Sequence, residues 1–199
     1  MIRVFVAVEL TRELRQALGL AQAQTKERLM RRLATDARIQ WVRPESIHLT
    51  LKFLGDVDEG RIQAMRAALD GTLGQTSRFS VDVGGLGVFP NARAPRVLWI
   101  GLADTSHRLS RLAADVEAAF TPFGFPTEGR PFSPHLTLAR IKEQARDVGQ
   151  ALTASGALTE AVTAGSLAVG SVALMRSELK SSGAVYTRLW EVPLRNPES

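Results

Sequence analysis

Cysteine is absent from this chain of 199 residues, and only three of its residues are histidines. The absence of cysteine excludes disulfide bonds, thiolate nucleophiles and most zinc sites, and it suits the reducing conditions of the cytoplasm. The sequence also has no run of about 18 apolar residues, which a membrane-spanning helix would need. We therefore expect a cytoplasmic protein without a membrane segment.

The composition supplies an ordinary globular core and an excess of positive charge. Apolar residues make up 45% of the chain, which is enough for a sizeable core. The length fits one domain or two small lobes. The net charge of +5 favours an anionic partner such as RNA, although solubility alone would also explain it.

The pattern of apolar residues predicts the same order of elements twice. Residues 2–8 alternate as a half-buried strand does and lack a signal-peptide cleavage site. Thr11 is placed to cap the first helix, and Asp104 or Thr105 to cap the third. The further segments are a helix over 12–33, β-rich residues 39–55, a helix over 58–73, strands over 79–89 and 96–102, a helix over 104–120, a strand over 133–141, a helix over 145–155, and two long strands over 164–179 and 184–192 joined by a tight turn at 180–183.

This order predicts the α+β class, with residues 1–199 as a single bilobed domain. Each half contains a helix, a strand, a second helix and a pair of strands, and no linker separates the halves. We therefore expect two pseudo-symmetric lobes, each an antiparallel sheet backed by helices, with a central cleft between them.

A short segment occurs twice, as RPESIHLTL at 43–51 and as RPFSPHLTL at 130–138. Side chains two residues apart on a strand project from the same face, about 6.5–7 Å apart. His48 therefore shares a face with Thr50, and His135 with Thr137, while the leucines point to the core. Two such pairs across a cleft suit in-line hydrolysis of a phosphodiester. One imidazole acts as base and the other as acid, the hydroxyls hold the phosphate oxygens, and no metal is needed.

Two other interpretations of the repeat are open. The two imidazoles could bind zinc, but a catalytic zinc usually has a third protein ligand. The remaining histidine, His107, lies near the start of a helix, where we expect it to be solvated, and no carboxylate adjoins either HLTL segment. Alternatively, both segments are core strands kept after gene duplication, although a buried imidazole needs partners and packs no better than leucine.

The two HLTL segments resemble the HxTx motifs of the 2H phosphoesterase superfamily. The resemblance is closest to the bacterial and archaeal RNA 2′,3′-cyclic phosphodiesterases, historically called 2′-5′ RNA ligases. Residues 2–10 are similar to the first strand of that family, and HLTLKFLG and RPFSPHLTLAR to its two signature segments. Residues 177–186 are similar to its closing hairpin.

The resemblance implies a site in the cleft and hydrolysis of a ribose 2′,3′-cyclic phosphate to a 2′-phosphomonoester without a cofactor. It assigns His48 as the general acid that protonates the leaving 3′ oxygen, and His135 as the general base that activates water. Thr50 and Thr137 would bind phosphate oxygens. The symmetry of the repeat does not itself distinguish the two histidine roles. The implied partner is RNA with cyclic phosphate ends, fragments of tRNA being one candidate source, and we expect a monomer.

Several residues beside the motifs are candidates for substrate binding. Arg140 matches a family position near the phosphate, but strict alternation places it on the leucine face unless the strand bulges, so an ion-pair role stays open. Arg130 and Arg43 lie at the mouth of each repeat, where they could contact the RNA backbone or be solvated. Phe53 and Trp41 could stack on a base or belong to the core, and core packing is the expectation.

Three functions remain in competition at this point. The first is the RNA cyclic phosphodiesterase. The second keeps the chemistry and changes the substrate, either to a small cyclic nucleotide or to RNA ends that the reverse reaction joins through a 2′-5′ bond. The third is a catalytically silent module that binds RNA ends, against which the two intact acid–base groups argue.

Overall fold

The computed structural model describes residues 1–33, 36–180 and 183–196. The tight turn expected at 180–183 includes Ser181 and Ser182, which lie outside these residues. The helices and strands are β1 (Ile2–Glu9), α1 (Arg12–Met30), β2 (Ile39–Trp41), β3 (His48–Val57), α2 (Ile62–Leu73), β4 (Phe79–Phe89), β5 (Val97–Ala103), α3 (Arg108–Phe120), β6 (His135–Ile141), α4 (Ala145–Ala154), β7 (Thr163–Val169), β8 (Ser171–Lys180) and β9 (Gly183–Pro193).

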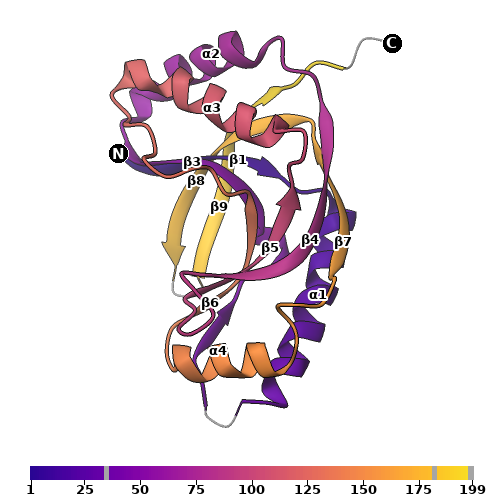
Figure 1. The fold of residues 1–199 in the computed structure, drawn as a ribbon. Coiled ribbons are helices and arrows are strands. Elements are labelled where there is room, and N and C mark those ends of the chain that lie inside the picture. The colour runs from indigo at the N-terminus through magenta and orange to yellow at the C-terminus, as the bar shows by residue number, and fades with distance from the viewer. Residues whose placement is uncertain (34–35, 181–182, 197–199) are drawn as a thin grey trace.

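The strands of the described chain form one curled antiparallel sheet, which confirms the α+β class (Figure 1). Its order is β7-β4-β5-β6-β3-β1-β8-β9, with β2 added to β6. The two sheets expected from the sequence are joined at the centre, where β3 and β6 meet through the single pair Leu49–Leu136. The repeated segments thus lie on the line that divides the sheet into two halves.

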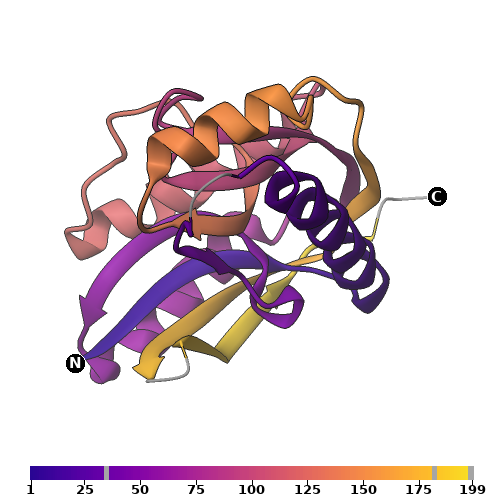
Figure 2. The same cartoon turned by 90° about the horizontal axis from the view of Figure 1, so that it is seen from below.

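Helices cover each half of this sheet on one face. Helices α2 and α3 pack over the half that contains β3, β1, β8 and β9, whereas α1 and α4 lie side by side over the other half (Figure 2). The two halves of the chain are therefore not the two halves of the structure. Helix α1 follows β1 but packs near β7, and the β4–β5 pair follows α2 but joins β6.

The prediction of one strand over residues 164–179 is wrong. The chain forms β7 up to Val169 and begins β8 at Ser171, so Gly170 separates two strands. Strand β7 pairs with β4, while β8 pairs with β1 in the other half of the sheet. The apolar pattern continues through Gly170 because both strands are buried, and so the pattern did not reveal the crossing.

Strand β1 is buried on both faces, not on one face as its alternation suggested. Val6 and Val8 belong to the main core beneath the helices. On the opposite face, Phe5 and Ala7 form a second apolar cluster with Met175 and with Ala173 of β8. This second cluster forms an apolar surface on one half of the sheet, on the same face as His48.

The expected helix caps are present. The Thr11 hydroxyl accepts a hydrogen bond from Leu14 N at 3.3 Å. The Asp104 carboxylate accepts from the backbone of Leu109 at 2.9 Å and of Ser110 at 2.8 Å, so it caps α3 from outside the helix. His107 precedes α3 with a φ of 55° and is exposed, as expected. In the described residues, no helix is both long enough and apolar enough to cross a membrane.

Candidate functional site

The two HLTL segments meet at the centre of the sheet. Leu49 and Leu136 are buried at 1% and 0% exposure on the helix-covered face, and the polar side chains next to them point to the opposite, open face. One residue away from the leucine pair, the antiparallel register sets His48 across from Thr137, and Thr50 across from His135. The same-face prediction for the four side chains is confirmed, and pseudo-symmetry gathers them in one cluster.

Each imidazole is oriented by the same hydrogen bond. His48 Nδ1 lies 2.8 Å from the carbonyl oxygen of Ser46, and His135 Nδ1 lies 2.7 Å from that of Ser133. A carbonyl oxygen only accepts, so Nδ1 is the donor and carries the proton in both rings. This leaves Nε2 of each neutral ring free to accept a proton from a substrate or a water. The two serines belong to the repeat, so the repeated segment includes the group that orients its histidine.

Aromatic side chains from distant strands enclose His48. Its ring centroid is 4.6 Å from that of Phe5, and Tyr186 of β9 contacts it edge-on at 5.0 Å. Burial in this environment is the main cause that lowers the pKa of His48 to about 4, and the positive charges of Arg140 and Arg15 act in the same direction. In the free protein, His48 is therefore neutral through the range from pH 5 to 8.

A second aromatic pair flanks His135. Phe89 of β4 meets its ring edge-on at 5.0 Å, and the Trp99 ring lies 6.2 Å away. Gly87 leaves room for Trp99, since a Cβ at this position would lie 2.2 Å from two carbon atoms of the indole ring. Both histidines thus have aromatic walls, contributed by segments far from them in the sequence.

A β-bulge in β3 changes which side chains reach the open face. Ala7 pairs with Thr50 and Val6 with Lys52, so Leu51 is the extra residue. Lys52 is turned inward, at 3% exposure, where its Nζ lies 2.6 Å from the Glu117 carboxylate.

The same bulge turns Phe53 outward. Its side chain is 65% exposed, with its ring 6.1 Å from that of Phe5. The expected core packing of Phe53 is wrong, and this aromatic ring adjoins the site on the open face. Trp41, by contrast, packs partly buried against the core.

A matching bulge in β6 brings Arg140 to the site. Trp99 pairs with Thr137 and Leu98 with Ala139, so Leu138 is the extra residue. Arg140 is exposed, and its charge is among those that lower the pKa of His48. In the described residues Arg140 has no carboxylate partner, so the structure gives no support to an ion-pair role. The two bulges place Phe53 and Arg140 at equivalent positions of the repeat.

Gln22 of α1 supports the second bulge and was missed from the sequence. Its buried amide donates to the carbonyl oxygens of Val42 and of Leu138, each at 2.8 Å. Leu138 is the residue that shifts the alternation before Arg140. The signal was present in the sequence, because Gln22 is a polar residue on the same helix face as Leu14 and Leu18.

The other predicted residues have no side-chain partner within the described part of the chain. No hydrogen bond engages the hydroxyls of Thr50 or Thr137 within residues 1–33, 36–180 and 183–196, so both can serve a ligand. Arg43 and Arg130 are exposed at the start of each repeat, likewise without an ion pair in this part of the chain. Across the same residues, no group of three or more histidine, aspartate or glutamate side chains could hold a metal ion.

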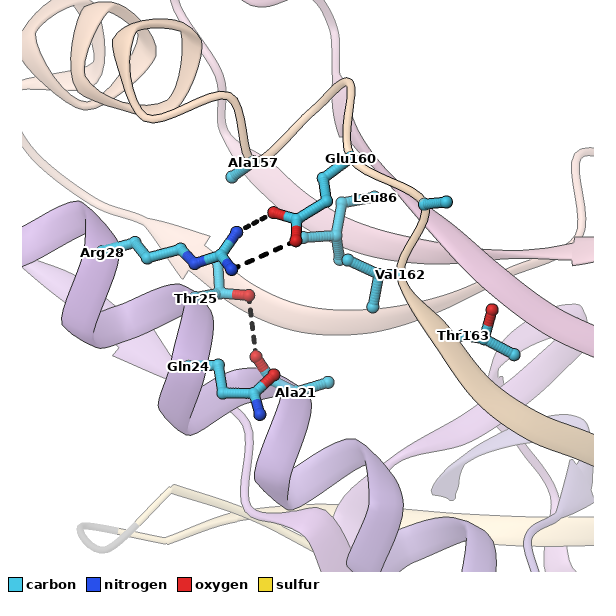
Figure 3. A pocket seen from close by; sticks show the side chains of 10 residues that line it. Ala21, Gln24, Thr25, Arg28, Leu86, Ala157, Glu160, Val162 and Thr163 are labelled. Carbon is cyan, nitrogen blue, oxygen red and sulfur yellow. Dashed lines mark hydrogen bonds and ion pairs between the residues drawn. The ribbon is translucent and has the colours of Figure 1, made fainter.

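A hollow of about 230 Å³ elsewhere on the molecule is not part of this site. It lies between α1 and the segment before β7, where Figure 3 shows the Arg28 guanidinium facing the Glu160 carboxylate. The second contact of this fork spans 3.1 Å. Both charged groups are thereby satisfied within the protein, so the ion pair joins α1 to this segment and leaves no charge for a ligand.

Comparisons with known proteins agree with this geometry. Residues 9–99 and 100–186 match the family model described as LigT like Phosphoesterase. The RNA 2′,3′-cyclic phosphodiesterase of Methanothermobacter thermautotrophicus is 36% identical over 186 residues, covering 94% of this chain and 95% of the relative. The protein of the same description from Thermus thermophilus is 35% identical over 202 residues, covering 98% and 91%.

Solved structures show the same fold. The crystal structure of TT0787 of Thermus thermophilus superposes with a TM-score of 0.77 at 31% identity, covering 99% of this chain and all of that one. That of E. coli LigT complexed with 3′-AMP superposes with a TM-score of 0.74 at 24% identity, covering 97% and 98%. The second likeness concerns the fold alone.

Proposed function

Because the chain belongs to the LigT-like phosphoesterase family of 2H phosphoesterases, we propose that it is an RNA 2′,3′-cyclic phosphodiesterase that works by paired histidine catalysis without a metal. The observation that carries the proposal is the pair of imidazoles, His48 and His135. Each has its Nδ1 held by a carbonyl and its Nε2 free, on either side of one residue pair. Binding alone would need no such pair of titrating groups.

The reaction follows from these positions. His135 takes a proton from water as the oxygen attacks phosphorus, and the bond from phosphorus to the ribose 3′ oxygen breaks. His48 gives its proton to that 3′ oxygen, and the phosphate stays on the 2′ oxygen. The hydroxyls of Thr50 and Thr137 donate to the non-bridging oxygens, whose charge Arg140 also balances.

The histidine roles come from the resemblance to the family, and the low pKa of His48 sets a condition on them. A proton donor must be protonated in the complex, whereas His48 in the free protein is neutral above about pH 4. The cyclic phosphate is an anion and would attract a proton onto the adjacent imidazole. The acid role of His48 therefore requires that substrate binding raises its pKa.

The proposal extends to the oligomeric state, the cellular location and the RNA substrates of the enzyme. Both motifs come from one chain, so the site is complete in a monomer. The lack of cysteine suits the cytoplasm. Arg43 and Arg130, exposed at the entrance of each repeat, would contact the RNA backbone, and tRNA fragments with cyclic phosphate ends would be among the substrates.

An oligonucleotide that ends in a 2′,3′-cyclic phosphate tests the reaction. We expect a single product that carries a 2′-phosphomonoester, and full activity in excess EDTA, because the mechanism uses only imidazole and hydroxyl groups. Product identity can be read by mass spectrometry after treatment with a 2′-phosphate-specific enzyme. Formation of a 3′-phosphate, or loss of activity on chelation that zinc or manganese restores, would contradict the mechanism.

We also propose that Phe53 stacks on a base next to the cyclic phosphate, since its exposed ring lies beside Phe5, which in turn contacts His48. Replacing Phe53 with alanine should raise KM about 5- to 100-fold, the range expected for one stacked base, with little change in kcat. The Phe53→Trp variant should restore KM. The control is Leu20→Ala on α1, which removes an apolar side chain that is 67% exposed. An equal KM in Phe53→Ala and wild type would remove the stacking role.

A further inference from the structure

A groove of about 750 Å³ lies between α4 and the loop that joins β4 to β5, next to each other at the bottom of Figure 1. Two arginines and no acidic residue line it. Its lining residues are Ala92, Arg93, Arg146, Gly149, Gln150, Thr153 and Ala154. Arg93 stands on the loop and Arg146 on the first turn of α4, so the two positive charges come from opposite walls.

The walls of this groove are held in place without a ligand. The Asn91 side chain accepts hydrogen bonds from the backbone of Arg93 at 3.1 Å and of Ala94 at 3.2 Å, which fixes the turn of the loop. Helix α4 approaches the loop so closely at Gly149 that a Cβ there would lie 2.1 Å from the carbonyl oxygen of Ala92. The distance between the walls is therefore set by backbone packing.

The charges of the groove are not used inside the protein. Within the described residues, neither Arg93 nor Arg146 has an ion pair, whereas Arg28 and Arg38 each face a glutamate. The partner of Arg38 is Glu143, so this acidic residue between β6 and α4 is already neutralised. Two guanidinium groups without an internal partner suit an external phosphate, which they can bind through two parallel hydrogen bonds.

The loop that forms one wall of the groove is connected at both ends to strands that reach the histidine site. The loop begins after Phe89, whose ring contacts His135, and ends at Val97, which pairs with Arg140. Val97 follows Arg93 by four positions in the sequence, a length that spans at most about 14 Å. The groove thus lies within reach of the nucleotides next to the one whose phosphate is cleaved.

We propose that this groove binds the backbone of the RNA strand on the 5′ side of the terminal nucleotide. The inference rests on the proposed function, because a 2′,3′-cyclic phosphate stands at the 3′ end and the rest of the strand must leave the site in the 5′ direction. The groove makes the enzyme prefer an oligonucleotide over a cyclic mononucleotide, through contacts to phosphates and without reading the sequence.

The test compares two substrates in the variant Arg93→Ala/Arg146→Ala. For a ten-nucleotide RNA with a 2′,3′-cyclic phosphate, KM should rise on the order of 10-fold or more. The dependence of log KM on log salt should become less steep by about 1.4, which is the contribution of two phosphates in a single strand. For 2′,3′-cyclic AMP, KM and kcat should stay as in the wild type.

The matched control is Arg66→Ala/Arg111→Ala, which removes two exposed arginines from α2 and α3 and changes the net charge equally. An equal rise of the oligonucleotide KM in both double variants, or an equal rise for the mononucleotide, would overturn the groove proposal. Direct binding of a fluorescent ten-nucleotide RNA tests the groove proposal separately from the proposed phosphodiesterase activity. Binding that depends on the groove without hydrolysis would refute the phosphodiesterase and support the groove, whereas hydrolysis with a KM independent of length would do the reverse.

Discussion

Replacing His48 with alanine is expected to slow hydrolysis of an RNA 2′,3′-cyclic phosphate by about 100- to 10,000-fold, the usual contribution of one acid–base group. Replacing His135 should cost a similar factor. A substrate with sulfur in place of the 3′ oxygen distinguishes the two variants, since a thiolate leaves without being protonated. It should restore much of the activity of His48→Ala and much less of the activity of His135→Ala, as measured by kcat/KM.

The opposite pattern would exchange the two roles, and the structure supplies a reason to look for it. The pKa of His48 is lowered to about 4, first by burial and then by Arg140 and Arg15, so its neutral form is favoured. If His48 is the acid, a bound phosphate must raise that pKa, which a titration of its ring protons by NMR with and without a 2′-phosphate product would record. If its pKa stays near 4 in the complex and sulfur rescues His135→Ala, then His48 is the base.

The features of the site that the sequence predicted correctly all depend on short stretches of chain. Strand alternation is a local property, so it placed His48 with Thr50 and His135 with Thr137 on one face. The duplication of the segment then indicated that two such faces lie together, and the pairing of Leu49 with Leu136 does bring the two segments side by side. The resemblance extended this to the family, which the comparisons confirm.

The features that the sequence did not reveal depend on contacts between distant segments. A bulge needs a partner strand to define its register, so nothing in HLTLKF or HLTLAR alone shows that Phe53 and Arg140 turn toward the site. Gln22 holds one bulge from a helix more than a hundred residues away in the chain. Burial is likewise the main cause that lowers the pKa of His48, and the rings that contact it, Phe5 and Tyr186, come from opposite ends of the sequence.

For a similar reason, the sequence pattern did not reveal that consecutive segments of the chain pack in different halves of the sheet. Apolar patterns report that a strand is buried and do not report which neighbour buries it. The boundary at Gly170 therefore looked like the interior of one strand, although β7 and β8 pair in different halves of the sheet. The functional consequence is that strands from the two ends of the chain, β1 and β9, enclose His48. Strands β4 and β5, from the middle of the chain, enclose His135.

Removing either threonine hydroxyl is expected to have the second largest effect on catalysis. Thr50→Val and Thr137→Val should each lower kcat by about 10- to 1000-fold, a range whose upper part is the loss measured for one donor to a developing oxyanion. Both hydroxyls face the site and have no hydrogen bond within the described chain, so valine, which has the same shape, should leave the fold unchanged.

Two comparisons make the threonine result specific. Thr137→Ser keeps a hydroxyl at this position and should retain most of the activity, while Thr25→Val removes a buried hydroxyl that donates to Ala21 O at 2.7 Å in α1 and should leave kcat unchanged. Thermal unfolding of every variant shows whether the fold is intact. If Thr137→Val turns over as fast as the wild type, the hydroxyl does not hold the phosphate, and the charge on the non-bridging oxygens must be balanced by Arg140 and the two imidazoles alone.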